Sequence, residues 1–235
     1  MRPPLWKSDE LVTACDGALF DPYLGCAPIS GIKIDSRNCG DGDLFVALKG
    51  NQQDGHDFLA NAADAKAAAC LVSHPQDDLS TAQIVVDDTL AGLTRLGAAG
   101  RNRFGGSMVG ITGSVGKTGS KDMLAHVLTN FGETHASQRS YNNHIGVPIT
   151  LSSLPADYDF AVQEIGMNAA GEIANLTALV KPDVAMVTRI ANTHSGFFDT
   201  MEDIAEAKAE IFQGLKVNGI AVLNFDDPFF QQLAT

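Results

Sequence analysis

A lysine and a threonine follow a glycine-rich turn in residues 108–123, which read M-V-G-I-T-G-S-V-G-K-T-G-S-K-D-M. Glycines let the backbone direct its N–H groups toward an anion, and a helix start adds partial positive charge. In such a loop Lys117 would reach the β- and γ-phosphates of a nucleotide, and the Thr118 hydroxyl would coordinate Mg²⁺. The residues of this predicted phosphate loop are Gly113, Ser114, Val115, Gly116, Lys117, Thr118 and Gly119.

The spacing of the glycines is that of a short variant. Gly113 and Gly116 enclose two residues instead of the usual four, and Gly110 does not supply the standard first glycine. The alternative is a glycine-rich turn that enters a helix without binding anything. A strand, a loop, the Lys-Thr pair and an apolar helix occur together here, which favours the phosphate loop.

Regular alternation of strands and helices surrounds this loop. Residues 109–112 are predicted to form a buried strand, and the helix from Lys117 is predicted to turn Met123, Leu124 and Val127 inward. Further strands are predicted at 133–136, 160–165, 184–187 and 220–224, and helical segments at 149–154, 171–180 and 201–215. Such alternation predicts a mostly parallel sheet flanked by helices on both faces.

Ligands of such sheets gather at the carboxyl ends of the strands, and this selects two further residues. Glu164 lies near the end of the predicted strand 160–165, where a carboxylate could hold Mg²⁺; the alternative is a partly exposed acid at a strand end. His194 follows the strand 184–187, although a lone histidine is more often structural. By spacing alone, Lys208 would be an ordinary solvated helix lysine paired with Glu206 or Glu210.

Residues 29–103 predict a smaller α/β unit. Its expected strands are 29–34, 44–48, 67–72 and 83–86, its helices are 57–66 and 89–103, and the boundary is expected at 104–106. Between the first two strands lies Asp35-Ser36-Arg37, where spacing alone indicates only a solvated turn.

Composition indicates a globular cytoplasmic protein. The chain has 235 residues, of which 45% are hydrophobic, and its net charge of -12 argues against non-specific binding to nucleic acid or anionic membranes. No run approaches the roughly 20 apolar residues of a membrane span, so no membrane insertion is expected. The four cysteines show no metal-binding spacing, which favours reduced thiols.

A set of motifs resembles the ATP-dependent Mur ligases of peptidoglycan synthesis. The motifs are T-G-S-V-G-K-T (112–118), Y-N-N-H-I-G-V-P (141–148), E-I-G-M-N (164–168), the loop around His194 and A-K-A-E-I-F (207–212). D-S-R (35–37), G-D-L-F-V-A-L-K-G (42–50) and D-G-H (54–56) are most similar to the branch that joins D-alanyl-D-alanine to UDP-N-acetylmuramoyl-tripeptide. The resemblance runs from about residue 29 to the end.

The resemblance implies an enzyme of three domains. Residues 1–104 would form the UDP-substrate-binding domain and residues 105–235 part of the central ATP-binding domain, while the domain for the incoming dipeptide would be absent. ATP would phosphorylate the substrate carboxylate, and the dipeptide amine would attack the acyl phosphate to form an amide. ATP and Mg²⁺ are therefore the implied cofactors, and a monomer is expected.

The resemblance also assigns residues to roles. The catalytic set is Lys117, Glu164, His194 and Lys208, and the Mg²⁺ ligands are Thr118, Glu164, His194 and Lys208, with Lys208 carbamylated. Asn224, together with Asp226 or Asp227, would border the adenine and ribose. Asn142 and Asn143 would contact substrate or phosphate, and Ser36 and Arg37 would lie on the UDP side.

Departures from the family pattern leave alternatives open. Gly119 stands where relatives carry Ser or Thr, and Ala169 where His is expected. The last residues, 227–235, resemble the first turns of a helix, so an incomplete ligase unable to complete the reaction alone is expected. The alternatives are another Mur-type ligase, a folylpolyglutamate-like synthetase, or a non-catalytic binding protein with the same fold.

Overall fold

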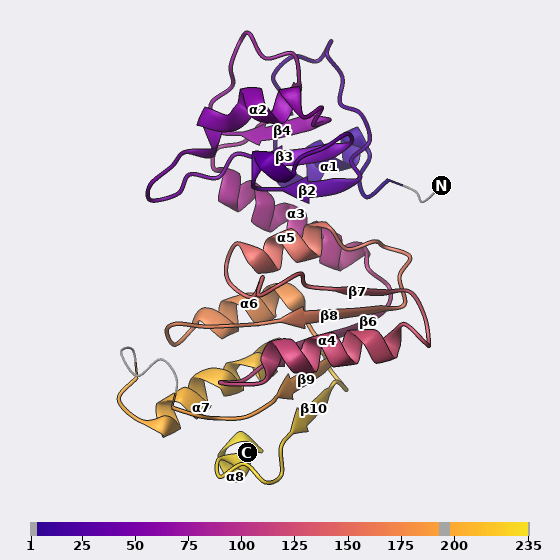
Figure 1. Ribbon diagram of the computed structural model, residues 1–235. Coiled ribbons are helices and arrows are strands. Elements are labelled where there is room, and N and C mark those ends of the chain that lie inside the picture. Colours follow the sequence, from indigo (N-terminus) through magenta and orange to yellow (C-terminus); the bar gives the residue numbers. More distant parts are fainter. Residues whose placement is uncertain (1–3, 193–197, 235) are drawn as a thin grey trace. The chain divides into compact units, whose positions relative to one another are not determined.

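The computed structural model describes residues 4–192 and 198–234 (Figure 1). The chain divides into two compact units, residues 1–100 and 101–235. Each unit contains a five-stranded sheet within the described residues, and helical segments connect most of the successive strands. The predicted α/β class with mostly parallel sheets is therefore confirmed.

The sheet of the first unit has the strand order β1-β5-β4-β3-β2. Its strands are β1 (Ala18–Leu19), β2 (Gly31–Lys33), β3 (Asp43–Val46), β4 (Ala69–Val72) and β5 (Ala82–Val85). All neighbours pair in parallel except the short edge strand β1, which is antiparallel to β5. The helical segments are α1 (Ser8–Cys15), η1 (Ser36–Asn38), η2 (Gly55–Phe58), α2 (Leu59–Asp64) and α3 (Thr89–Arg103).

The alanine-rich helix of the first unit is shorter than the predicted 57–66. The Asp54 carboxylate accepts a hydrogen bond from the backbone N–H of His56 at 3.0 Å. This bond starts a 3₁₀ turn over Gly55–Phe58, and the α-helix begins only at Leu59. An aspartate side chain that bonds the backbone two residues on competes with the regular helix, which explains the delay.

The second unit is built on a fully parallel sheet with the order β10-β9-β6-β8-β7. Its strands are β6 (Ser107–Thr112), β7 (Thr134–Ala136), β8 (Phe160–Glu164), β9 (Val184–Val187) and β10 (Ile220–Leu223). The helical segments are α4 (Lys117–Leu128), α5 (Gly146–Ser152), α6 (Glu172–Val180), α7 (Met201–Ala209), η3 (Glu210–Gly214) and α8 (Phe230–Leu233).

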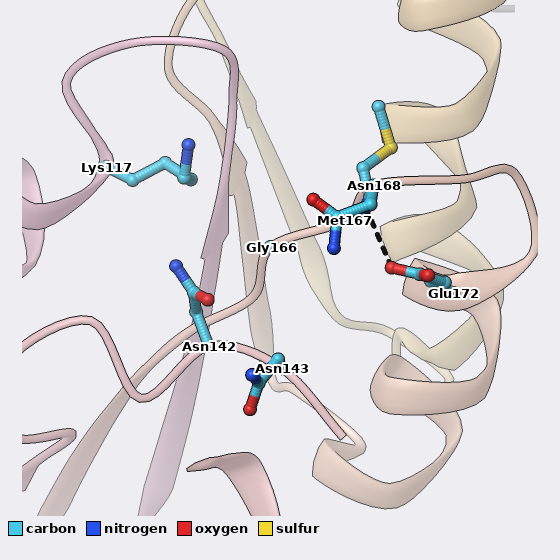
Figure 2. Close-up of a pocket in the computed structure, with 7 residues that line it drawn as sticks. All are labelled: Lys117, Asn142, Asn143, Gly166, Met167, Asn168 and Glu172. Atoms are coloured by element: carbon cyan, nitrogen blue, oxygen red, sulfur yellow. Dashed lines mark hydrogen bonds between the residues drawn. The ribbon is translucent and has the colours of Figure 1, made fainter. Parts of the chain in front are cut away.

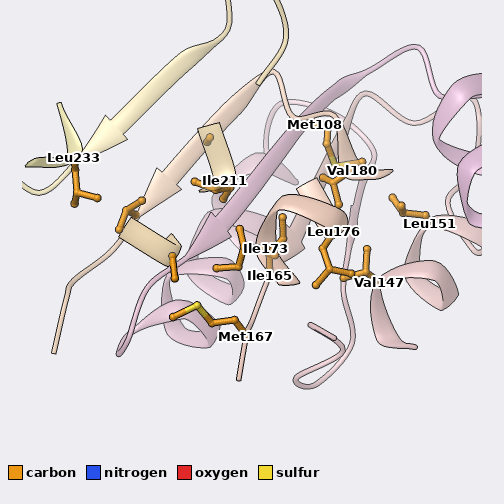
Figure 3. Packing of buried hydrophobic residues seen from close by; sticks show 14 of the residues in the cluster. Met108, Val147, Leu151, Ile165, Met167, Ile173, Leu176, Val180, Ile211 and Leu233 are labelled. Atoms are coloured by element: carbon orange, nitrogen blue, oxygen red, sulfur yellow. The ribbon is translucent and has the colours of Figure 1, made fainter. Parts of the chain in front are cut away.

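Alternating side chains on the strands of the second unit face two separate apolar layers. On one face Met108 and its neighbours pack with residues of α5, α6 and α7 in the main core (Figure 3). On the other face Val109, Ile111 and Val162 pack against Leu124 and Leu128 of α4. Successive side chains of a strand point to opposite faces of the sheet, and here both sets are apolar. Both faces of this parallel sheet are therefore covered by helices.

The predicted inner face of α4 is wrong at two positions. Met123 and Val127 are 71% and 45% exposed, whereas Lys121 is only 2% exposed. Helical residues three and four apart share a face, so the buried face runs through Lys121, Leu124 and Leu128. A prediction based on the spacing of apolar residues could not place a lysine on that face.

The predicted helix 201–215 is interrupted. It runs as α7 to Ala209 and continues as the 3₁₀ segment Glu210–Gly214. The Glu210 carboxylate accepts hydrogen bonds from the backbone N–H groups of Gly171 (2.6 Å) and Ala174 (2.9 Å) at the start of α6.

Within the described part of the chain, no helix combines the length and apolarity needed to cross a membrane.

Candidate functional site

The loop between β6 and α4 has the backbone that its glycines predict. Gly113 has φ +147° and Gly116 has φ +84°, conformations that side chains rarely adopt. A Cβ added at Gly113 would also collide with the Thr188 hydroxyl. That hydroxyl donates to the Val115 carbonyl at 2.7 Å, so the loop is held against the end of β9. The loop is thus a tight backbone turn that leads directly into a helix start.

The Lys117 side chain closes back over this loop. Its Nζ donates to the carbonyl oxygens of Gly113 at 2.7 Å and Ser114 at 3.3 Å. Burial lowers the pKa of Lys117, and the nearby Glu164 charge partly opposes that shift. An ammonium has three N–H donors, so these bonds leave one for a ligand among the described contacts. Lys117 is thus placed to present positive charge at the mouth of the loop.

Glu164 is the polar centre of the site. Its carboxylate accepts from the Thr118 hydroxyl at 2.8 Å and from the Asn142 side-chain amide at 2.7 Å. Because β8 pairs with β6, with Ile111 opposite Glu164, the acid lies at the same sheet edge as the phosphate loop. Glu164 is 1% exposed, which contradicts the alternative of a partly exposed acid. A carboxylate that accepts two hydrogen bonds has lone pairs left for a further ligand.

Buried hydroxyls beside the loop lack partners among the described residues. These atoms are Thr112 Oγ1 at the end of β6 and Ser114 Oγ within the loop. Buried polar groups are nearly always hydrogen-bonded, so these two hydroxyls retain bonding capacity for a ligand. Together with Lys117, they fit an anion bound in the loop. The hydroxyl of Thr118 and the carboxylate of Glu164 are hard oxygen donors, which fit Mg²⁺.

Lys208 is buried, contrary to the solvated helix lysine that spacing alone indicates. It is 1% exposed and lies on α7. Burial, reinforced by the positive charge of Lys117, lowers its pKa from 10.5 to about 8. Its expected partner Glu210 is instead bound to the start of α6. A lysine with this pKa carries an appreciable fraction of neutral amine near neutral pH.

A pocket of about 170 Å³, open to solvent, lies beside the phosphate loop (Figure 2). Its lining residues are Lys117, Asn142, Asn143, Gly166, Met167, Asn168 and Glu172. Figure 2 shows Lys117 and Asn142 directed into the same space. The Glu172 carboxylate accepts from the backbone N–H of Asn168 at 2.8 Å. Sequence reasoning missed Glu172, although a carboxylate at a helix start beyond a strand end was a usable signal.

The two asparagines of the Y-N-N-H motif have different surroundings. Asn142 reaches Glu164, as described above. The Asn143 side-chain oxygen instead accepts from the backbone N–H groups of Ile145 (3.1 Å) and Gly146 (2.8 Å), so it stabilises the turn that leads into α5. Asn143 nevertheless lines the pocket.

The residues predicted to border the nucleotide base follow β10. Asn224 and Asp226 are exposed, and the Asn224 side-chain oxygen accepts from the Asp226 backbone N–H at 3.1 Å. The adjacent Asp227 is buried and accepts from the Ile190 N–H at 2.8 Å, which is a structural role.

The predicted metal ligand His194 lies outside the described residues. Among residues 4–192 and 198–234, no three His, Cys, Asp or Glu side chains gather to hold a metal by themselves. Mg²⁺ commonly takes only one or two protein ligands and completes its shell with water and phosphate oxygens. The Thr118–Glu164 pair is compatible with that mode.

Ser36 and Arg37 lie in the first unit, on η1. Ser36 is buried, and the Arg37 side chain is 87% exposed. The Arg37 guanidinium donates to both carboxylate oxygens of Asp35, at 2.9 and 2.7 Å, and this lowers the pKa of Asp35. The arginine is thus pre-oriented at the surface of its own unit.

Comparison with known families agrees with this site. Residues 111–235 match the Mur ligase middle domain, and residues 28–96 match the Mur ligase family, catalytic domain. The chain belongs to the Mur ligase family. The matched middle domain includes the whole phosphate loop, Glu164 and Lys208.

Similar proteins are UDP-N-acetylmuramoyl-tripeptide--D-alanyl-D-alanine ligases. The Bacillus subtilis enzyme is 40% identical over 217 residues, which cover 92% of this chain and 48% of that enzyme. The Escherichia coli enzyme is 42% identical over 199 residues, which cover 85% of this chain and 44% of that enzyme. The chain therefore spans about half the length of the curated relatives it matches.

Two solved structures share the fold. MurF from Acinetobacter baumannii superposes with a TM-score of 0.84 at 34% identity, covering 97% of this chain and 50% of that one. MurF ligase from Thermotoga maritima in complex with ADP gives a TM-score of 0.73 at 32% identity, covering 86% of this chain and 47% of that one.

Proposed function

We propose that this chain binds Mg²⁺-ATP at the loop 113–119 and is the nucleotide-binding part of an amide ligase. The observation that carries the proposal is the Glu164 carboxylate, which Thr118 and Asn142 hold beside a glycine-rich loop closed by Lys117. The similarity to a ligase whose structure contains ADP supports the same ligand here. The buried orphan hydroxyls of Thr112 and Ser114 support an anion in the loop.

The proposed reaction adds D-alanyl-D-alanine to UDP-N-acetylmuramoyl-tripeptide, which is the reaction named for the similar curated proteins. ATP would transfer its γ-phosphate to the tripeptide's terminal carboxylate, and the dipeptide amine would displace phosphate to form the amide. A carboxylate approaching a triphosphate meets like charge. Lys117 lowers this repulsion through its ammonium, and the loop amides orient the phosphates.

Thr118 and Glu164 would hold Mg²⁺, with Lys208 and His194 as further candidate ligands. Bound there, Mg²⁺ would supply positive charge to the phosphates during transfer. Asn142 keeps the Glu164 carboxylate in place through its amide. The lowered pKa of Lys208 makes a neutral amine available for reaction with CO₂, which supports carbamylation at this position.

The first unit would bind the UDP portion of the substrate. Ser36 and Arg37 are the candidate contacts, and Asn143 is a candidate contact in the second unit. Asn224 and Asp226 follow the edge strand β10 and are candidates for the base and ribose. We propose a location in the cytoplasm, where ATP is plentiful, and a monomeric form.

Isothermal titration calorimetry with ATP and Mg²⁺ tests the proposal. The wild-type chain should bind, and Lys117→Ala should weaken binding by at least about tenfold, since it removes a charged contact to phosphate. Lys181→Ala is the matched control, because Lys181 is exposed and follows α6. Equal affinities of wild type and Lys117→Ala would remove Lys117 from the site. Titration with UDP-N-acetylmuramoyl-tripeptide tests the substrate, and absence of binding would count against this ligase branch.

A further inference from the structure

Lys121 is a buried cation on the helix that follows the phosphate loop. It is 2% exposed and lies one helical turn beyond Lys117. Its Nζ donates to the carbonyl oxygens of Ser137 at 2.8 Å and Arg139 at 3.1 Å, and it pairs with the Asp122 carboxylate at 2.9 Å. An ammonium has three N–H donors, and each has a partner here. This arrangement offsets the desolvation that would otherwise exclude a charge from the buried face.

The carbonyls that Lys121 binds belong to the loop 137–142, which also contacts β8. The Ser137 hydroxyl accepts from the backbone N–H of Glu164 at 3.2 Å. The Tyr141 carbonyl accepts from the Gln163 side-chain amide at 3.0 Å. At the end of the loop, the Asn142 amide donates to the Glu164 carboxylate at 2.7 Å. The loop thus connects α4 on one side with the site carboxylate on the other.

The backbone of this loop needs external support. Arg139 has φ +49°, a left-handed conformation that is unfavourable for a residue with a Cβ and persists where surrounding contacts fix it. The Arg139 carbonyl is one of the two that Lys121 binds. A methionine of similar length could fill the same volume, but it could not hold either carbonyl. The cation therefore supplies orientation that apolar packing would not.

We infer that Lys121 is a positioning residue that fixes the loop 137–142 to the phosphate-loop helix. Thr118 lies on that helix and Asn142 on that loop, and both bind the Glu164 carboxylate. By joining helix and loop, Lys121 keeps these two donors at a fixed separation, so the carboxylate is presented to Mg²⁺ in one orientation. Lys121 acts through the backbone and does not touch the ligand. The inference rests on the proposed Mg²⁺-ATP site.

Calorimetry with ADP, in the presence of Mg²⁺ or of EDTA, tests the inference on the full chain. Lys121→Met should weaken Mg²⁺-ADP binding about tenfold or more, but change ADP binding in EDTA by less than about twofold. Hydrogen exchange of the backbone amides at 138–142 should become faster in this variant. Lys121→Arg should retain most of the gain in ADP affinity that Mg²⁺ gives, because the arginine guanidinium can also donate to two carbonyls.

Asp122→Asn is the matched control. The Asp122 side chain is 66% exposed, and its replacement leaves both carbonyl bonds of Lys121 in place, so the effect of Mg²⁺ should persist. Equal weakening of ADP binding with and without Mg²⁺ in Lys121→Met would overturn the inference, because it would show a general loss of structure. If Lys121→Met does not fold, Lys121→Gln takes its place with the same two outcomes. A wild-type chain that binds no nucleotide would refute the proposed function first, and the inference with it.

Discussion

Replacing Lys208 with methionine should remove a pH dependence from the stability of the second unit. Lys208 is 1% exposed, and its pKa is lowered from 10.5 to about 8 by burial and by the charge of Lys117. This difference corresponds to about 3 kcal/mol of unfavourable free energy for the buried ammonium form. Between about pH 8 and 10.5 Lys208 holds its proton in the unfolded chain but has lost it in the folded chain. The contribution of Lys208 to the free energy of unfolding should therefore rise with pH across this window.

Lys208→Met lacks this titration. Below pH 8 it should be more stable than the wild type by up to about 3 kcal/mol, and the difference should disappear as the pH approaches 10.5. Urea unfolding, followed by far-ultraviolet circular dichroism in buffers free of CO₂, measures this difference in the free energy of unfolding. Fluorescence is unsuitable, because the one tryptophan, Trp6, lies in the first unit. Lys181→Met is the exposed control. A stability difference between Lys208→Met and wild type that stays constant over this pH window would refute the reasoning.

Three further predictions concern local structure. Gly119→Ala should raise the free energy of unfolding by about 0.5–1 kcal/mol, because an added Cβ meets nothing within 4 Å and alanine favours the helix; an unchanged urea midpoint would contradict this. Gly113→Ala should destabilise the chain by about 1–3 kcal/mol and abolish nucleotide binding, which thermal unfolding and calorimetry would show. Burial raises the pKa of Asp183, but bonds including one from Lys216 outweigh this and lower it overall, so Asp183 should stabilise the fold above its unfolded pKa of 3.8. That contribution is lost as the pH falls through the lower folded pKa, and Asp183→Asn should abolish it in acid titrations.

Much of the fold follows from local patterns. Leucines at helical spacing, Leu90, Leu93 and Leu96, predict α3 over the same residues that the structure shows, Thr89–Arg103. Helix α7 is the contrary case: it ends at Ala209 because Glu210 bonds the start of α6. Such a contact joins residues that are far apart in the sequence, so local periodicity cannot reveal it.

The site shows the same division between local and distant information. The phosphate loop can be recognised from consecutive residues, because its glycines, lysine and threonine all lie within 113–119. Lys121 and Lys208 cannot, because a lysine in a helical pattern normally faces solvent, and only the three-dimensional packing buries these two. Resemblance to a family identified Lys208 but gave no role to Lys121.

A double-mutant cycle on Thr118 and Glu164 tests the central claim, that these two residues together hold Mg²⁺ beside a bound nucleotide. ADP affinity is measured with Mg²⁺ and with EDTA in the wild type, Thr118→Val, Glu164→Gln and the double variant. Each single variant should lose most of the gain in affinity that Mg²⁺ gives, and the double variant should lose little more. Equal gains from Mg²⁺ in all four proteins would contradict the claim.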